Sequence, residues 1–210
     1  GTFTHSATSN NTQFNSSTSA SANAAYGITA GELIFAANGD YTVKFGSLTS
    51  TGGNIRGGNS ATGTATLEVG NLGTSASIAG NLNNGGTKIV ALRKVGNGTL
   101  TLSGTNNFTG PTTVANGSLM VNGTTTATPV TVASGATFGG TGTVGTVTVQ
   151  SGGILAPGTT IGTLNSGNTT LNGTLSIEIA SPSSADRLNT SGSVALGGPL
   201  SLVAPAGLPG

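Results

Sequence analysis

Only eleven of the 210 residues carry a formal charge, so few side chains are available for chemistry. A glycosidase requires two carboxyl groups about 5–9.5 Å apart. Near the C-terminal end, Asp186 is the acid closest in sequence to Glu178, but the adjacent Arg187 indicates a loop ion pair. The complete set of acids is Glu32, Asp40, Glu68, Glu178 and Asp186. Their scatter does not predict an acid–base pair, and we expect no enzyme.

The densest polar cluster in the first half of the chain surrounds Asn38-Gly39. Glu32 and Asp40 flank this dipeptide, and Lys44 follows closely. Asn-Gly is a strong turn signal, so we interpret the cluster as a solvated hairpin. Aromatic platforms for stacking sugars are also scarce, because the chain has only two tyrosines.

Basic residues gather at Lys88, Arg93 and Lys94, and the single histidine is His5. The basic cluster could contact an anionic cell-surface polysaccharide, although a solvated face is the expectation we favour. His5 stands alone in a polar segment, which does not favour a metal site or a catalytic triad.

The sequence GTGTVG at residues 140–145 fits the pattern G-x-G-x-x-G. A dinucleotide site would need a helix after this motif and an acid about 20 residues further on. The residues that follow are instead typical of a strand, and no acid occurs before Glu178. We therefore predict a tight corner and no nucleotide cofactor.

The composition excludes several further classes of protein. No cysteine is present, which rules out disulfides and cysteine metal sites. The formal net charge of +1 gives no basis for binding nucleic acid. No apolar run approaches the ~18 residues of a membrane span, and a calcium solenoid would need an Asp in each repeat. No signal peptide is evident, so we expect a mature or excised segment.

Gly, Thr, Ser and Asn together make up 117 of the 210 residues, and Gly interrupts every potential helix. The apolar content is still sufficient for folding. Short alternating segments recur instead, such as residues 100–102, 130–132, 147–149 and 175–179. Each has the pattern of a strand with one apolar and one polar face.

These strands recur at a nearly constant period. Glycines that precede an apolar residue are spaced by 19, 18, 18, 20 and 25 residues from Gly98 to Gly198. This period suits one coil of a parallel β-solenoid, so we predict an all-β fold with coils of about 18–20 residues. About eleven coils would form a rod of roughly 50 Å. Stacking predicts an interior apolar ladder of Leu100, Leu119, Phe138, Leu155 and Leu175.

A second predicted ladder occupies the corner before these strands. Asn and Gly tolerate a positive φ, which a sharp corner needs, and stacked Asn side chains can bond between coils. The members are Asn97, Gly98, Asn116, Gly117, Ser134, Gly135, Asn172 and Gly173. The alternative is N-glycosylation, because Asn97, Asn116, Asn122 and Asn172 begin Asn-Gly-Ser/Thr sequons.

The array is uneven along the chain. Residues 1–25 form a polar lead segment that would serve as a cap, a linker or a donated strand. Residues 26–96 are expected to form less regular coils, and residues 97–210 regular coils. The final apolar stretch, residues 200–208, shows no evident cap, so we expect an open end there.

Residues 95–121, VGNGTLTLSGTNNFTGPTTVANGSLMV, resemble the autotransporter-associated β-strand repeat, also called the passenger-associated transport repeat. The segments GGTGTVG (139–145), GGILAPG (152–158), IGTL (161–164) and ADRL (185–188) resemble those that trail this repeat. The resemblance implies a right-handed parallel β-helix on the surface of a Gram-negative bacterium. It supplies no catalytic residues.

Three functions remain open from the sequence. The first is a structural stalk or passenger segment of a larger surface or adhesive protein. The second is an extracellular fibre subunit that self-associates end to end through open coil edges. The third is a carbohydrate-binding or carbohydrate-degrading β-helix. Under all three we expect no membrane insertion by this segment.

Overall fold

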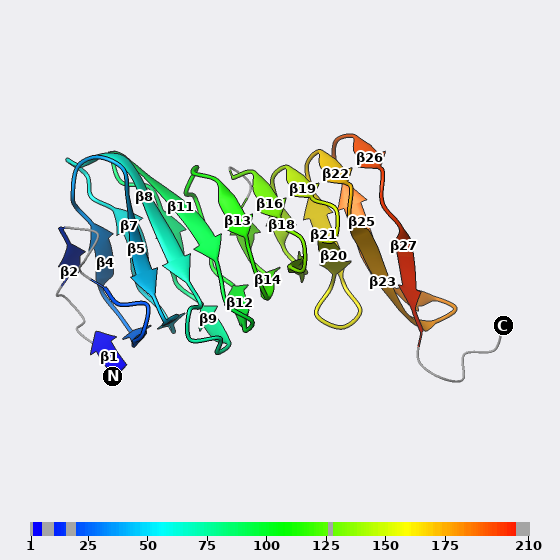
Figure 1. Ribbon diagram of the computed structural model, residues 1–210, viewed down its shortest axis with the longest axis horizontal. Coiled ribbons are helices and arrows are strands. Elements are labelled where there is room, and N and C mark those ends of the chain that lie inside the picture. Colours follow the sequence, from blue (N-terminus) through cyan, green and yellow to red (C-terminus); the bar gives the residue numbers. More distant parts are fainter. Residues whose placement is uncertain (1, 6–10, 16–19, 126–127, 205–210) are drawn as a thin grey trace.

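The computed structural model describes residues 2–5, 11–15, 20–125 and 128–204, and a stack of strands runs along its long axis (Figure 1). Within these ranges it contains 27 strands and no helix. The strands pair in parallel, except for the hairpin of β23 (Thr174–Ser181) and β24 (Ser184–Ala185). The predicted all-β class and the parallel β-solenoid are therefore confirmed.

Two continuous sheets cover two sides of the rod. The long sheet has eleven strands, which are β1 (Thr2–His5), β3 (Ala25–Ile28), β6 (Ser47–Ser50), β9 (Ala76–Ile78), β12 (Thr99–Leu102), β14 (Ser118–Val121), β17 (Thr137–Gly140), β20 (Ile154–Pro157), β23, β24 and β27 (Leu200–Val203). The eight-stranded sheet comprises β5 (Tyr41–Phe45), β8 (Thr62–Val69), β11 (Thr87–Lys94), β13 (Thr112–Val114), β16 (Val130–Val132), β19 (Val147–Val149), β22 (Thr169–Leu171) and β26 (Val194–Leu196).

Two shorter sheets share the third side. The first contains β2 (Asn11–Phe14), β4 (Glu32–Phe35), β7 (Asn54–Gly57) and β10 (Asn81–Asn83). The second contains β15 (Thr124–Thr125), β18 (Thr143–Val144), β21 (Thr163–Ser166) and β25 (Arg187–Thr190). Single bridges from Asn83 to Asn107 and from Thr105 to Thr124 connect the two sheets through the intervening coil. Most turns of the chain therefore visit the three sides in the same order.

The length of a coil changes along the rod. Paired residues lie 19 apart at Thr99 and Ser118 and 17 apart at Thr137 and Ile154, close to the predicted 18–20. The N-terminal coils are longer, with Ser50 paired to Ile78, because they carry longer strands such as β8 and β11. The eight-stranded sheet consequently marks eight turns, and the expectation of about eleven was wrong.

In the interior, apolar residues of successive coils stack on one another as a ladder. Leu100 pairs with Leu119, Leu119 with Phe138, Phe138 with Leu155, and Leu155 with Leu175. The first four are at most 1% exposed, whereas Leu175 is half-buried. Alternation explains the ladder, because successive side chains of a strand point to opposite faces and only one face is dry.

Aromatic side chains fill the wide N-terminal coils. The Phe14 ring lies 6.1 Å from that of Phe35 and 5.6 Å from that of Phe45, and Tyr26 packs edge-on against Phe45. Phe14 belongs to the lead segment, whose strands β1 and β2 pair with β3 and β4 of the same chain. The described part of residues 1–25 thus forms the first coil and closes this end over the core.

The last described coil is different, because its interior positions are exposed. Four of its residues continue interior ladders above Thr169, Leu171, Leu175 and Ile177. They are Val194 (43% exposed), Leu196 (71%), Leu200 (61%) and Leu202 (61%). Residues 205–208 of the predicted uncapped stretch lie outside the described residues. Within the described part, this end presents an apolar cross-section and strand edges.

We predict that Leu119→Asp lowers the free energy of unfolding by several kcal/mol, because it places a charge in a dry ladder. Ser118→Asp, on the outward face of the same strand, is the matched control and should cost less than about 1 kcal/mol. Denaturant unfolding followed by circular dichroism measures both. Equal effects of the two substitutions would show that Leu119 is not an interior residue.

Candidate functional site

The corner before the long sheet contains the predicted Asn-Gly ladder, but the members are not all at one level. Thr99, Ser118, Thr137 and Thr174 occupy equivalent register positions in successive strands. The residues two positions before them are Asn97, Asn116, Gly135 and Asn172, which are therefore equivalent too. Ser134 therefore lies one residue out of step with the asparagines. The cause is Ala136, which stands between Gly135 and the start of β17, whereas Gly98, Gly117 and Gly173 directly precede their strands.

Positive φ explains only part of this ladder. Gly117 (φ 62°) and Gly135 (φ 77°) adopt it, but Gly98, Gly173 and every described non-glycine residue do not. Gly98 and Gly173 are required for another reason. A Cβ atom on Gly98 would collide with the main chain of Thr74, and one on Gly173 would collide with the carbonyl of Gly153. Close approach of successive coils is the constraint at these two positions.

Asparagine bonds between coils do exist, at corners outside the predicted ladder. Each of five side chains accepts a main-chain N–H bond from the next coil, namely Asn38 from Thr62 (3.0 Å), Asn81 from Thr105 (3.0 Å), Asn84 from Thr109 (3.3 Å), Asn122 from Thr141 (3.2 Å) and Asn168 from Ser193 (3.0 Å). Asn97, Asn116 and Asn172 are exposed and make no such side-chain bond within the described residues. An Asn one coil before a Thr or Ser is the signal that would have found these bonds.

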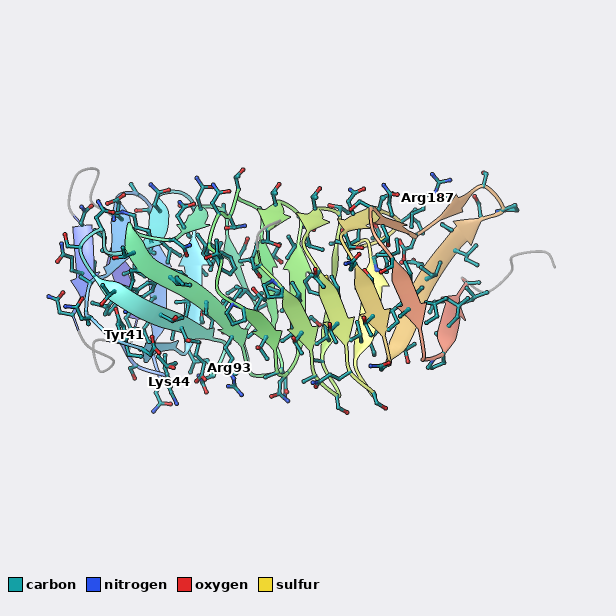
Figure 2. All side chains as sticks on the ribbon, turned by 90° about the horizontal axis from the view of Figure 1, so that it is seen from above. Tyr41, Lys44, Arg93 and Arg187 are labelled. Atoms are coloured by element: carbon teal, nitrogen blue, oxygen red, sulfur yellow. The ribbon has the colours of Figure 1, made fainter. Side chains whose placement is uncertain are left out.

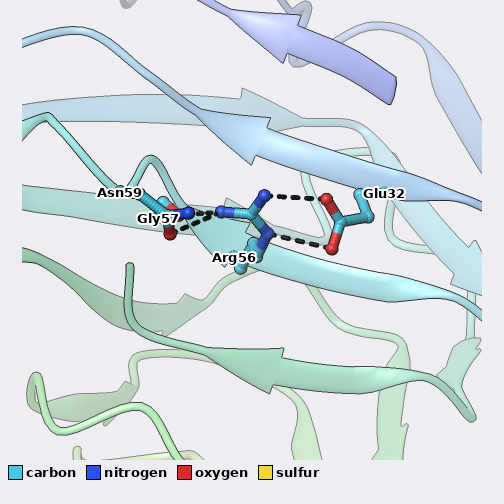
Figure 3. Close-up of polar contacts among 4 residues, drawn as sticks. All are labelled: Glu32, Arg56, Gly57 and Asn59. Atoms are coloured by element: carbon cyan, nitrogen blue, oxygen red, sulfur yellow. Dashed lines mark hydrogen bonds and ion pairs between the residues drawn. The ribbon is translucent and has the colours of Figure 1, made fainter. Parts of the chain in front are cut away.

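Glu32 belongs to a coil-to-coil ion pair and not to a hairpin. Arg56 donates two hydrogen bonds to its carboxylate, at 2.9 and 2.8 Å, from the next strand of the same sheet (Figure 3). Arg56 also donates to the Gly57 carbonyl and to Asn59. The bonds from Arg56 lower the pKa of Glu32, against an opposing effect of burial.

The predicted hairpin at Asn38-Gly39 is wrong, because β4 and β5 lie in different sheets and these residues form the corner between them. Asp40 accepts the N–H of Thr64 at 2.7 Å. Lys44 pairs instead with Glu68 of the next coil, at 3.7 Å. The cluster ties successive coils together and does not form a catalytic centre.

The predicted ion pair between Asp186 and Arg187 is also absent from the described residues. Asp186 is buried, and its two carboxylate oxygens accept the N–H groups of Gly162 and Glu178, both at 2.9 Å. Arg187 is exposed on the outside of the rod (Figure 2). Each carboxylate oxygen of Asp186 thus accepts one main-chain hydrogen bond. Asp186 holds the loop at residues 158–162 against β23.

The basic cluster is not the solvated face that we expected, because two of its three members are buried. Lys88 is 0% exposed and Lys94 is 1% exposed. Burial lowers the pKa of Lys88, and it lowers that of Lys94 to about 8. Only Arg93 faces outward, on the same side of the rod as Lys44 (Figure 2), and it pairs with Glu68 at 3.0 Å. Sequence reasoning missed the two lysines because an isolated Lys is usually exposed.

The surface has shallow grooves, and the polar groups are engaged with the fold in the groove beside Arg56. A groove of about 460 Å³ on the third side is lined by Arg56, Asn59 and Gln13, among others, and Arg56 is saturated there by Glu32 and Asn59. Tyr41 lies beneath the Lys88 ammonium, 4.2 Å from its ring centre, so its face is not open to a sugar. No aromatic platform for carbohydrate emerges from these contacts.

The remaining motifs form no chemical site within the described residues. The GTGTVG segment spans the end of β17, a corner and β18, with no following helix. No group of three potential metal ligands occurs among the described residues. The side chain of His5 lies outside the described residues. The part of the chain that is described has no helix capable of crossing a membrane.

Residues 92–121 match the family model of the passenger-associated-transport-repeat. The matched segment runs from the last residues of β11 through β12 and β13 to the end of β14. It contains Lys94, Asn97, Leu100, Asn116 and Leu119. No curated protein matches the chain. The repeat and the β-solenoid together agree with the resemblance found in the sequence.

The ion pair of Glu32 and Arg56 predicts a loss of stability in acid. Because the pKa of folded Glu32 is below its usual 4.5, its contribution is present above pH 4.5 and is lost as the pH falls through the folded pKa. We expect Arg56→Met to cost about 1 kcal/mol at pH 7 and to remove this acid dependence. Arg187→Met is the matched control. Parallel pH profiles of unfolding for the parent and the Arg56 variant would contradict the assignment.

Proposed function

We propose that this chain is a non-enzymatic structural segment of a bacterial surface or adhesive protein, a β-solenoid stalk in its passenger region. The observation that carries the proposal is the repeat match at residues 92–121 inside an uninterrupted solenoid. The match suggests a passenger-like segment, and the continuous stack suggests that the segment serves as a rod.

The contacts of the charged side chains support a structural role. Glu32, Asp40, Glu68 and Asp186 all bond to partners in neighbouring coils or loops. A catalytic carboxylate must instead reach a substrate in a plausible pose. Charges that are used to join coils are not free for that task.

The geometry suits a spacer. Eight turns at the strand-pairing distance give a rod of roughly 40 Å, and its length would grow with every added coil. The outward positions of the regular strands are mostly small and polar, as in the column Thr113, Thr131, Thr148 and Thr170. Such a surface keeps the rod separate from its surroundings.

The open end supports attachment to further structure. Val194, Leu196, Leu200 and Leu202 occupy ladder positions that one more coil would cover. The opposite end is closed by Phe14 and its aromatic neighbours. Two occupants of the open end can be compared. A further coil of a longer parent chain would bring apolar residues in register with these four, whereas the closed end of a second copy would not. The further coil is therefore the better fit.

We place this segment on the exterior of a Gram-negative cell. Antibodies raised against the purified chain should therefore label intact cells that produce it, and external protease should remove the label. A cytoplasmic protein serves as the control and should be labelled only after permeabilisation. Labelling of the solenoid that also requires permeabilisation would refute the surface location.

The exposed last coil also favours a second candidate, an extracellular fibre subunit that self-associates. Electron microscopy across a dilution series separates the two functions. For a stalk segment we expect isolated rods of roughly 40 Å at every concentration. Fibres that lengthen with concentration would establish the fibre subunit instead.

A further inference from the structure

β11 is unusual within the eight-stranded sheet because lysine side chains occupy interior positions near both of its ends. Lys94 pairs with Val69 on one side and with Val114 on the other. The same ladder continues with Val132 and Val149, which are 0% exposed. Lys88 pairs with Gly63, which leaves room for the long side chain. Two cations therefore stand where other strands carry small or apolar residues.

The Lys88 ammonium ties its coil to the two coils before it. It donates to the carbonyl of Thr62 at 2.9 Å, one coil back, and to that of Gly39 at 2.5 Å, two coils back. Its charge also lies over the ring of Tyr41. These partners converge at the corner that leads into the eight-stranded sheet.

The Lys94 ammonium ties its coil to the following one. It donates to the carbonyls of Val95 (2.7 Å) and Gly96 (2.8 Å) in its own corner and to that of Asn116 (3.2 Å) in the next coil. Three acceptors match the three protons of an ammonium group. Together the two lysines connect four consecutive strands, β5, β8, β11 and β13.

In a solenoid of similar coils, the strand sequences alone do not determine which coil stacks on which. β13 (TTV), β16 (VTV) and β19 (VTV) present almost the same three residues, so β11 could pair with any of them. Weakly specified register is prone to slippage. Strand sequence alone therefore does not explain why β13 is the partner of β11.

The corners that follow these strands are less alike than the strands. The corner between β13 and β14 spans residues 115–117, whereas those after β16 and β19 span residues 133–136 and 150–153. The Asn116 carbonyl belongs to the shorter corner, and we expect the longer corners to present their carbonyls at other positions. In a slipped stack, the Lys94 ammonium would be buried without its third acceptor, which is a costly arrangement for a charge.

We propose that Lys88 and Lys94 fix the register of the solenoid at β11, where the long N-terminal coils give way to the short regular ones. Lys88 holds β11 against the two coils before it. Lys94 selects the coil of β13, through the Asn116 carbonyl, as the one that stacks next. This role goes beyond that of a passive rod, since it determines which coils become neighbours during folding.

Paired cysteines on the outer face test the register directly, because the chain has no native cysteine. Arg93 and Thr113 are register partners, and Thr131 is the partner of Thr113 one coil further on. The pair R93C/T113C is separated by about 4.8 Å and can form a disulfide, whereas R93C/T131C spans about 9.6 Å and cannot. The second pair therefore reports slippage.

We expect the refolded R93C/T131C chain to remain uncross-linked with Lys94 present. Lys94→Met should produce a cross-linked fraction of that pair and reduce cross-linking of R93C/T113C. Lys88 bonds to the preceding coils, so Lys88→Met should instead reduce cross-linking of E68C/R93C, the register partners on that side. The matched control is Lys44→Met, which removes a lysine whose side chain is 56% exposed and should leave all three pairs unchanged.

If Lys94→Met does not fold, Lys94→Gln replaces it, because the amide retains two of the three N–H donors. Off-register cross-links in the Lys94 variants alone would support the proposal. In-register cross-links as complete as in the parent would overturn it, even if the variants unfold more readily. A purely stabilising role would shift the unfolding midpoint and leave the cross-linking pattern intact.

Discussion

The structure depends on main-chain hydrogen bonds between parallel strands of successive coils, which hold adjacent coils about 4.8 Å apart. At that spacing, equivalent positions of successive coils lie in contact, so most interior ladders consist of similar residues. Leu100, Leu119, Phe138 and Leu155 form one such ladder. The corners are harder to satisfy, because their N–H and carbonyl groups leave the sheets and still need partners.

Corner groups are satisfied by whichever side chain has the complementary chemistry. Unpaired N–H groups are accepted by short oxygen-bearing side chains such as Asn38, Asn168 and Asp186. Unpaired carbonyls that point inward are capped by the two buried lysines, since an ammonium group donates without accepting. Asp40, Asp186, Lys88 and Lys94 thus bond to main-chain groups. Glu32 and Glu68 pair instead with basic side chains of neighbouring coils.

The repeating part of the fold could be predicted from the sequence, because alternation and period are local properties. The ladder from Leu100 to Leu155 follows from them directly. Partners one coil away could not be predicted where coil length varies, so Glu32 was assigned to a hairpin when its partner is Arg56, 24 residues on. The burial of Lys94 could not be predicted for a similar reason. Its acceptors are main-chain carbonyls, which every residue has, so no residue type in the sequence indicates them.

Each coil packs mainly on its two neighbours, so a solenoid has few of the contacts between distant segments that correct an error in a globular core. A wrong pairing at one level would be propagated by every coil that follows. Uniform ladders stabilise the stack and cannot by themselves exclude such errors, whereas a buried charge is costly wherever its acceptors are missing. The position of both lysines on β11 is consistent with this reasoning, because that strand pairs over eight residues with β8 and over only three with β13.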